Sequence, residues 1–243
     1  MKNFEKDFKK SLEKFYFDIM RMNKLVGNDY KDYSFSPRYN NLVREEIENE
    51  DETVDSILKK NYEGFVDGVI DVLVVGYFLY KVENKNDNIE LVSDSFKNLE
   101  VSEIATFIKE LIIYCQKSVI NDNIENILYK MEQISYTLGN HYNVDILGAF
   151  QEVMDSNFSK FPLVGDVDPD YEVEYIKNQK RKYTGVHYIV VEDIENGEKV
   201  KKYVFKNDKG KFLKPSCFRE PKIHMYLSND NSLISELYRY ISK

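Results

Sequence analysis

Two aspartates interrupt an otherwise apolar run in the first third of the chain. Residues 63–75 read EGFVDGVIDVLVV, with Asp67 and Asp71 four positions apart. In a helix this spacing places both carboxylates on one face, next to apolar side chains that such a helix buries. A charge on a packed face costs several kcal/mol unless an opposite charge or a metal ion accompanies it. No lysine or arginine occurs between Lys60 and Lys81, so the neutralising group has to come from elsewhere.

An acidic segment precedes this run. Residues 42–52 read LVREEIENEDE, in which Glu46 and Glu50 are spaced i,i+4 and Glu45 and Glu48 are spaced i,i+3. Either pair shares a helix face, where like charges repel one another unless a cation lies between them. The alternative interpretation is that residues 45–52 form a solvated face.

The two acidic segments together predict a metal site. If their helices face one another, carboxylates from both point into the space between them. A ligand set made only of oxygen atoms suits a hard cation, above all Mg²⁺ or Mn²⁺. A buried Asp–Lys pair is the alternative explanation for Asp67 or Asp71.

Helical periodicity dominates the first 160 residues. The expected helices cover residues 4–25, a segment from near Pro37 to about residue 50, residues 53–80 with a break near Asn61, a segment with Ser102 as N-cap, a segment from Asp122 or Asn123 to Gly139, and a last one ending near Asn157.

The pattern changes after residue 161. Residues 162–169 carry loop-forming prolines and a glycine, and β-branched and aromatic residues then flank the dipeptide Asn196-Gly197, which favours a tight hairpin turn. We therefore expect a mainly α fold, with a helical body at residues 1–161. Residues 162–243 form a β-hairpin and C-terminal segment packed on that body, within a single domain overall.

Composition limits the partners. The 243 residues carry a net charge of −8, so the surface repels nucleic acid on average, and we expect no nucleic-acid partner. Cys115 and Cys217 lie far apart, outside any C-x-x-C pattern, which fits a reducing cytoplasm. The longest apolar run, VIDVLVVGYFLY, is too short to span a bilayer and contains Asp71, so we expect no membrane span.

Four segments occur in an order that resembles a known family. They read LVREEIENE, DGVIDVLVVGYFL, AFQEVMDSNFSKF and GKFLKPSCFREP, spread over residues 42–221. The chain is similar to the all-α nucleoside triphosphate pyrophosphohydrolases, the MazG-like group and its relative phosphoribosyl-ATP pyrophosphohydrolase, above all to phage versions. Those typically read L-I-x-E-E-x-x-E, D-x-x-x-D-x-x-Y-V, E-V-x-x-S-N-M-S-K and G-K-x-x-K-P. The resemblance implies an all-α helical bundle, here with a β-hairpin appendage near the C-terminus.

The resemblance also implies a reaction and its residues. Enzymes of this family cleave an NTP or dNTP between the α and β phosphates, with Mg²⁺ held by helix carboxylates. It implies Glu46, Asp67 and Asp71 as catalytic residues, Glu45, Glu46, Asp67 and Asp71 as metal ligands, and Asn157, Lys160 and Lys214 as substrate-binding residues. Family members associate as homodimers or homotetramers, which we expect here too, in the host cytoplasm if a phage encodes the chain.

Two positions depart from the family pattern. Asn49 stands where the second ligand glutamate belongs, so that Asn49 ligates through its carbonyl or Glu45, Glu48 or Glu50 replaces it. Gly64 stands where a glutamate usually precedes the first aspartate, with Glu63 beside it. These departures keep two alternatives open: a non-catalytic nucleotide-binding or regulatory protein with a decayed metal site, and a phosphoribosyl-ATP pyrophosphohydrolase.

Overall fold

The computed structural model describes residues 2–84, 91–180, 182–195, 197–208 and 210–242. This part of the chain is mainly helical, with one two-stranded antiparallel sheet toward the C-terminus, as the sequence predicts. It divides into two compact units. Unit 1 consists of Met1–Met20, Asp29–Gln151 and Lys222–Lys243, and unit 2 of Arg21–Asn28 and Glu152–Pro221. In this division the segment from Lys222 onward belongs to the helical unit, and the expected organisation with a boundary at residue 161 stays a prediction.

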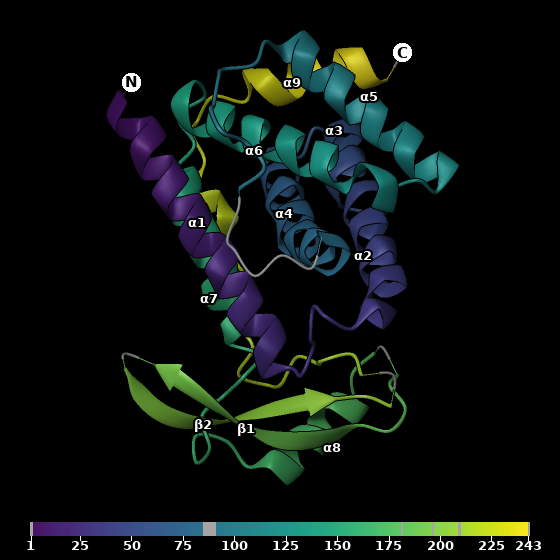
Figure 1. The fold of residues 1–243 in the computed structure, drawn as a ribbon, viewed down its shortest axis with the longest axis vertical. Helices are drawn as coiled ribbons and strands as arrows, with labels where there is room; N and C mark the ends of the chain where they lie inside the picture. The colour runs from purple at the N-terminus through teal and green to yellow at the C-terminus, as the bar shows by residue number, and fades with distance from the viewer. Residues whose placement is uncertain (1, 85–90, 181, 196, 209, 243) are drawn as a thin grey trace. The chain divides into compact units, whose positions relative to one another are not determined.

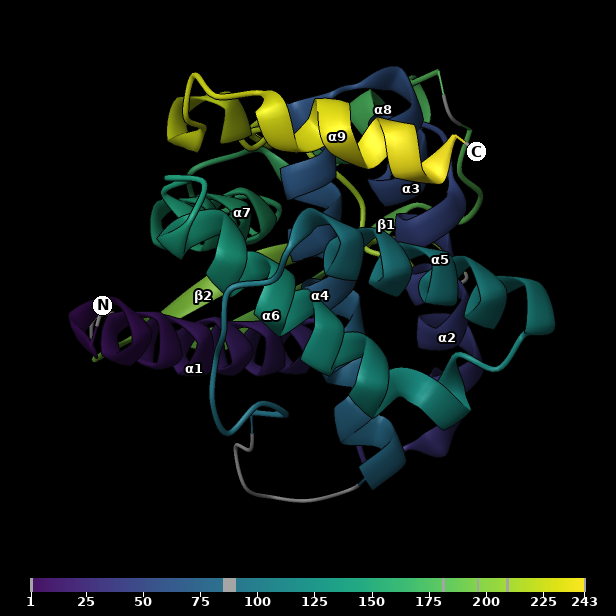
Figure 2. The ribbon, with the colours of Figure 1, turned by 90° about the horizontal axis from the view of Figure 1, so that it is seen from above.

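Unit 1 is a helical bundle around one central helix, α4 (Tyr62–Asn84). Helix α4 is buried on nearly all sides, in keeping with its almost continuous apolar sequence. Helices α2, α3 and α6 pack on it (Figure 1), and Figure 2 shows α9 lying beside α5 and α3. The elements of this unit are α1 (Lys2–Leu25, up to Met20), η1 (Tyr33–Phe35), α2 (Ser36–Glu48), α3 (Thr53–Lys59), α4, α5 (Val101–Lys117), η2 (Asn121–Asn123), α6 (Ile124–Asn140), α7 (Ile146–Phe158, up to Gln151), η3 (Ile223–Tyr226) and α9 (Ser232–Ile241).

The predicted break between α3 and α4 is confirmed. Lys60 adopts the left-handed conformation, with φ of 57°, and its amide donates to the carbonyls at the end of α3. Asn61 then donates its amide to the Ser56 carbonyl at 2.8 Å. This turn redirects the chain, so that α3 folds back on α4 instead of continuing it.

Two predicted helix ends are wrong. Helix α5 begins after Glu100, which forms a capping box with Glu103, so Ser102 is not the N-cap. Helix α6 continues to Asn140, so Gly139 does not end it. A Cβ at Gly139 would lie 2.4 Å from Cζ of Phe4, which shows that this glycine serves the close packing of α1 on α6.

Unit 2 is built on the hairpin of β1 (His187–Glu195) and β2 (Glu198–Lys206). The register pairs Glu195 with Glu198, which leaves a two-residue turn, as predicted. Gly197 in this turn has a φ of +83°, whereas Asn196 lies outside the described residues. Helix α8 (Pro169–Lys177) and helix α9 of unit 1 were not predicted. Helix α8 contributes to a small core of Ile176, Val186, Phe205 and Leu213.

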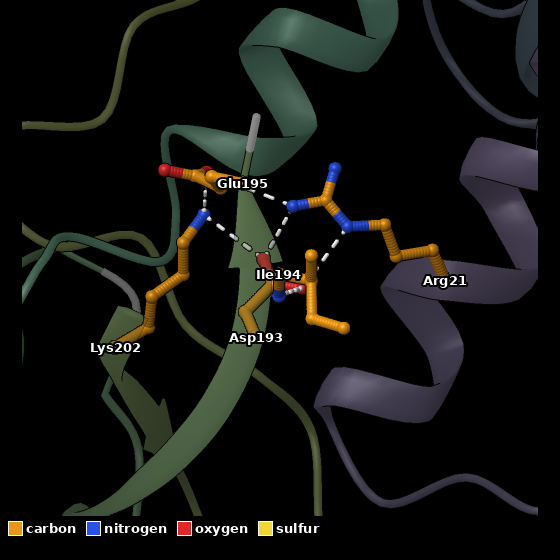
Figure 3. Close-up of polar contacts among 5 residues, drawn as sticks. All are labelled: Arg21, Asp193, Ile194, Glu195 and Lys202. Carbon is orange, nitrogen blue, oxygen red and sulfur yellow. Dashed lines mark hydrogen bonds and ion pairs between the residues drawn. The ribbon is translucent and has the colours of Figure 1, made fainter. Parts of the chain in front are cut away.

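A partly buried ion network, with Asp193 and Lys202 buried and Arg21 and Glu195 partly exposed, joins the tip of the hairpin to the last turns of α1 (Figure 3). Nε of Arg21 donates to Oδ1 of Asp193 at 3.0 Å, and its Nη2 contacts the other oxygen of the same carboxylate. Lys202 contacts Asp193 at 3.4 Å and also pairs with Glu195. Two cations therefore face two carboxylates, so the network is close to neutral, which a buried set of charges requires.

None of the described helices is both long and apolar enough to cross a membrane.

Candidate metal centre

Helix α2 presents one of its glutamates beside the core. Tyr39, Val43 and Ile47 recur at intervals of four and are buried, and α2 packs on α4 through this stripe. Glu46 precedes Ile47 by one position, so it lies at the margin of the buried stripe and is half-buried itself. Packing of α2 on α4 thus carries the Glu46 carboxylate toward α4.

The start of α3 is pressed against α4 at a glycine. Thr53, the first residue of α3, is fully buried. A Cβ at Gly68 would lie 2.8 Å from the Thr53 amide nitrogen and 2.7 Å from its Oγ1, so only glycine permits this approach. Oγ1 of Thr53 also donates a hydrogen bond to the Glu46 carbonyl at 2.8 Å. Thr53 therefore holds the residue before it, Glu52, between α2 and α4.

Three carboxylates meet as a result. Glu46, Glu52 and Asp71 each offer an oxygen atom, and these atoms all lie within 4.8 Å of one another. All three side chains are half-buried. Carboxylate oxygens from a helix, a connecting segment and a second helix make a ligand set suited to a hard divalent cation.

Burial and mutual repulsion change how this group titrates. Burial, together with the charges of Asp71, Glu52 and Glu45 and a hydrogen bond with Glu52, raises the pKa of Glu46 to about 10. Burial likewise raises the pKa of Glu52, with the charges of Asp67 and Asp51 acting in the same sense and the hydrogen bond from Glu46 acting against them. At neutral pH Glu46 is therefore protonated and donates to Glu52, a state that a bound cation would replace.

The rest of the acidic segment is neutralised at the surface. Lys59 contacts Asp51 and Asp55 at 2.8 Å each and Glu50 at 3.7 Å. Glu48 pairs with Arg44 at 2.8 Å across one turn of α2. The interpretation as a solvated face is therefore correct for Glu45, Glu50 and Asp51, whereas Glu46, Glu48 and Glu52 are half-buried.

The structure brings together two of the four predicted metal ligands, Glu46 and Asp71. Glu45 is exposed, yet its charge contributes to the raised pKa of Glu46, and Asp67 acts in the same way on Glu52. Sequence reasoning missed Glu52. The expected replacements for Asn49 were Glu45, Glu48 and Glu50, whereas Glu52 has extended backbone, with φ of −87° and ψ of −170°, and precedes α3.

The departure at Gly64 has a steric reason. A Cβ there would lie 2.4 Å from Oγ of Ser56 and 2.6 Å from Nδ2 of Asn61. Side chains of the turn that folds α3 back on α4 lie where a Cβ would be, so Ser56 and Asn61 would have to shift to admit one. Glu63 beside it accepts hydrogen bonds from the amide of His224, at 3.1 Å, and lies 3.2 Å from its Nδ1.

The predicted substrate-binding residues form a group of their own in unit 2. Nζ of Lys160 donates to Oδ1 of Asn157 at 2.5 Å. Lys214 pairs with Glu220 at 2.9 Å. Both ammonium groups lie near the ring of Phe218, which sequence reasoning did not single out.

Comparisons of the chain with protein-family models, with curated proteins and with solved structures found no match. The resemblance to the all-α nucleoside triphosphate pyrophosphohydrolases thus rests on the four sequence segments alone.

Proposed function

We propose that this chain is a Mg²⁺-dependent nucleoside triphosphate pyrophosphohydrolase that cleaves an NTP or dNTP to the monophosphate and pyrophosphate. One observation carries the proposal: oxygen atoms of Glu46, Glu52 and Asp71, from two helices and the segment before α3, lie within 4.8 Å of one another in the segments whose motifs resemble that family. Placing three carboxylates beside one another costs free energy through desolvation and mutual repulsion. Binding of a divalent cation would offset this cost, which explains why such a cluster is present.

The residues present fit such a cation. Three carboxylates supply oxygen ligands, and Asp67, one turn before Asp71 on α4, adds negative charge at the same place. Bound there, Mg²⁺ would neutralise phosphate charge and lower the pKa of an attacking water. Glu46, Glu52 and Asp71 would hold such an ion, and Asn157, Lys160 and Lys214 of unit 2 carry neutral and cationic groups of the kind that bind phosphates.

A panel assay tests the reaction. Purified protein is incubated with Mg²⁺ or Mn²⁺ and each NTP and dNTP, with dUTP and phosphoribosyl-ATP included, and products are separated by chromatography. Monophosphate with pyrophosphate is the expected outcome. Diphosphate with phosphate would mean that another bond is cleaved and would overturn the proposal. Turnover confined to phosphoribosyl-ATP would identify the chain as a phosphoribosyl-ATP pyrophosphohydrolase instead.

A second candidate is a non-catalytic nucleotide-binding or regulatory protein. The crowding at Gly64 favours it, because a side chain there would displace Ser56 or Asn61, and the carboxylate set differs from that of the family. Calorimetry with Mg²⁺ and a non-hydrolysable nucleotide distinguishes the two. Binding without turnover of any true nucleotide in the panel would support this second candidate.

Association into a homodimer or homotetramer is part of the proposal, as the family resemblance implies. Sedimentation of the purified chain tests it, and a monomer at all concentrations would contradict it.

A further inference from the structure

The hairpin of unit 2 has one outer edge that other described residues cover and one that they do not. The outer edge of β2 is covered by residues 162–164 and by Leu213. The bonds run from the Val164 amide to the Lys201 carbonyl at 2.9 Å, from the Tyr203 amide to the Pro162 carbonyl at 2.9 Å and from the Leu213 amide to the Phe205 carbonyl at 2.8 Å. Lys201, Tyr203 and Phe205 therefore direct backbone groups away from β1.

This pattern determines which backbone groups lie on the outer edge of β1. Residues directly opposite each other in an antiparallel pair either exchange both hydrogen bonds or both direct their groups outward. The register pairs Tyr188 with Phe205, Val190 with Tyr203 and Glu192 with Lys201. The amides and carbonyls of Tyr188, Val190 and Glu192 therefore point away from β2. Ile194 is next in this series, and its outward amide donates to Oδ1 of Asp193 at 2.8 Å.

The outer edge of β1 is open to a further strand. Within the described part of the chain, no backbone group outside β2 bonds to residues 187–195. The strand reads HYIVVEDIE and contains neither lysine nor proline, the residues that most often protect an edge strand. Amides and carbonyls at this spacing are the template to which an extended peptide adds, because its main chain supplies the missing hydrogen bonds.

The side chains beside this edge favour a basic partner. Val190 is 50% exposed and Ile194 is 62% exposed, and the exposed Glu192 lies between them on the same face of the strand. The other two carboxylates of β1 belong to the ion network at the hairpin tip, whereas Glu192 takes part in none of the ion pairs of the described residues. A strand with apolar residues beside Val190 and Ile194 and a cation beside Glu192 matches this row.

A second copy of β1 matches it less well. Two β1 strands would bring three carboxylates and no lysine or arginine against the same set, and like charges across a strand pair are destabilising. The strand that does pair with β1 in this chain, β2, reads EKVKKYVFK and carries four lysines. Charge therefore favours a basic strand over a second copy of β1.

We propose that the outer edge of β1 binds an extended basic segment of a partner protein by strand addition. The partner segment alternates apolar residues with lysine or arginine, and its main chain bonds to the outward groups of Val190 and Glu192. This docking surface lies within unit 2, whereas the candidate metal centre belongs to unit 1, so the binding does not depend on the proposed reaction.

Fluorescence anisotropy with labelled peptides and the full chain tests the proposal. One peptide matches the nine residues of β1 in length and alternates valine with lysine, and a second has glutamate in place of each lysine. We expect saturable binding of the lysine peptide and at least about ten-fold weaker binding of the glutamate peptide, because repulsion replaces attraction at Glu192. Hydrogen exchange measured by NMR should show new protection of the Val190 and Glu192 amides.

Two variants separate the main chain from the charge. Val190→Pro removes one outward amide and leaves the bonds to β2 in place, so binding should weaken by at least about ten-fold, whereas Val190→Thr keeps the amide and should bind within about three-fold of wild type. Glu192→Lys should reverse the preference between the two peptides. Glu198→Lys makes the same charge change at an exposed position of β2 and should retain the wild-type preference.

Thermal unfolding verifies that each variant is folded, and if Val190→Pro does not fold, Glu192→Lys and the exchange data decide. No binding of the lysine peptide, equal affinity for both peptides, or unchanged affinity in folded Val190→Pro would overturn the inference. Self-association of wild type that Val190→Pro abolishes, without binding of the lysine peptide, would assign this edge to a second copy and overturn it as well.

Discussion

Oγ1 of Thr53 donates a hydrogen bond to the carbonyl of Glu46 at 2.8 Å. Glu46 is in the last turn of α2, where carbonyls have no partner within the helix, so the Thr53 hydroxyl completes the C-terminal end of α2. The same threonine packs against Gly68 of α4. One buried, uncharged residue thereby connects the elements that carry all three carboxylates of the candidate metal centre.

Replacing Thr53 tests this connection. Thr53→Val keeps the shape and removes the hydroxyl, leaving a buried carbonyl without its donor, so we expect a loss of about 1–3 kcal/mol in the free energy of unfolding. Mg²⁺ affinity should also fall. Thr53→Ser retains the donor and should remain closer to wild type on both measures. Urea unfolding and calorimetry with Mg²⁺ give the two readouts, and equal Mg²⁺ affinity in all three proteins would separate Thr53 from the site.

Glu52 is expected to be a metal ligand. Glu52→Gln keeps the size and removes the charge, so Mg²⁺ binding measured by calorimetry should weaken by at least about ten-fold. Glu50→Gln is the matched control: it removes the same charge two positions away, from a side chain that is 86% exposed and 3.7 Å from Lys59. Loss of Mg²⁺ binding in Glu50→Gln with binding intact in Glu52→Gln would reverse the assignment.

The raised pKa of Glu46 predicts how stability changes with pH. Burial, with the nearby carboxylates, raises this pKa from 4.5 to about 10, so the folded, metal-free protein holds a proton that the unfolded chain releases. The corresponding stability is fully present below 4.5 and is lost as the pH rises toward 10. In EDTA, Glu46→Gln should therefore be more stable than wild type at pH 9 and lose less stability between pH 6 and pH 9.

With Mg²⁺ present, the order of stability at pH 9 should reverse, so that wild type is more stable than Glu46→Gln. A metal ligand has to be deprotonated, so Mg²⁺ should stabilise wild type more at pH 9 than at pH 6 and should stabilise Glu46→Gln little at either pH. Thermal unfolding with and without Mg²⁺ measures both effects. Parallel pH profiles for wild type and Glu46→Gln in EDTA would show that Glu46 is not the titrating group.

The ion network of unit 2 makes an opposite pH prediction. Burial acts to raise the pKa of Asp193, but hydrogen bonds from Arg21 and the Ile194 amide and the charges of Arg21 and Lys202 lower it below its ordinary value. The stability this group contributes is present above its unfolded pKa and is lost as the pH falls through the folded pKa. Asp193→Asn should cost about 3 kcal/mol at pH 7.

This cost should shrink at low pH, where the wild-type carboxylate is protonated as well. Glu192→Gln, an exposed acid on the same strand, serves as the control and should have little effect. Urea unfolding at pH 7 and pH 3 gives the comparison. An equal cost of Asp193→Asn at both pH values would mean that its charge is not what stabilises the hairpin.

Much of the fold follows from local sequence patterns. The long apolar run of α4, the break before it and the hairpin each depend on neighbouring residues, so periodicity and turn chemistry predict them. The unpredicted helices are short: α8 covers 9 residues and α9 covers 10. Helices of that length are stabilised mainly by packing against the rest of the protein, although Asp168 caps α8 just before Pro169 and α9 is strongly amphipathic.

The candidate metal centre also has a part that local sequence patterns predict and a part that they do not. Sequence alone determined that α2 and α4 carry carboxylates beside apolar residues, because helical spacing places side chains at regular angles around an axis. Only the tertiary structure decided that Glu52 joins Glu46 and Asp71, because the approach of Thr53 to Gly68 and the turn at Lys60 bring together residues that helical spacing does not relate. The same holds for the pKa of Glu46, since desolvation depends on which atoms surround a carboxyl group and not on its neighbours in the chain.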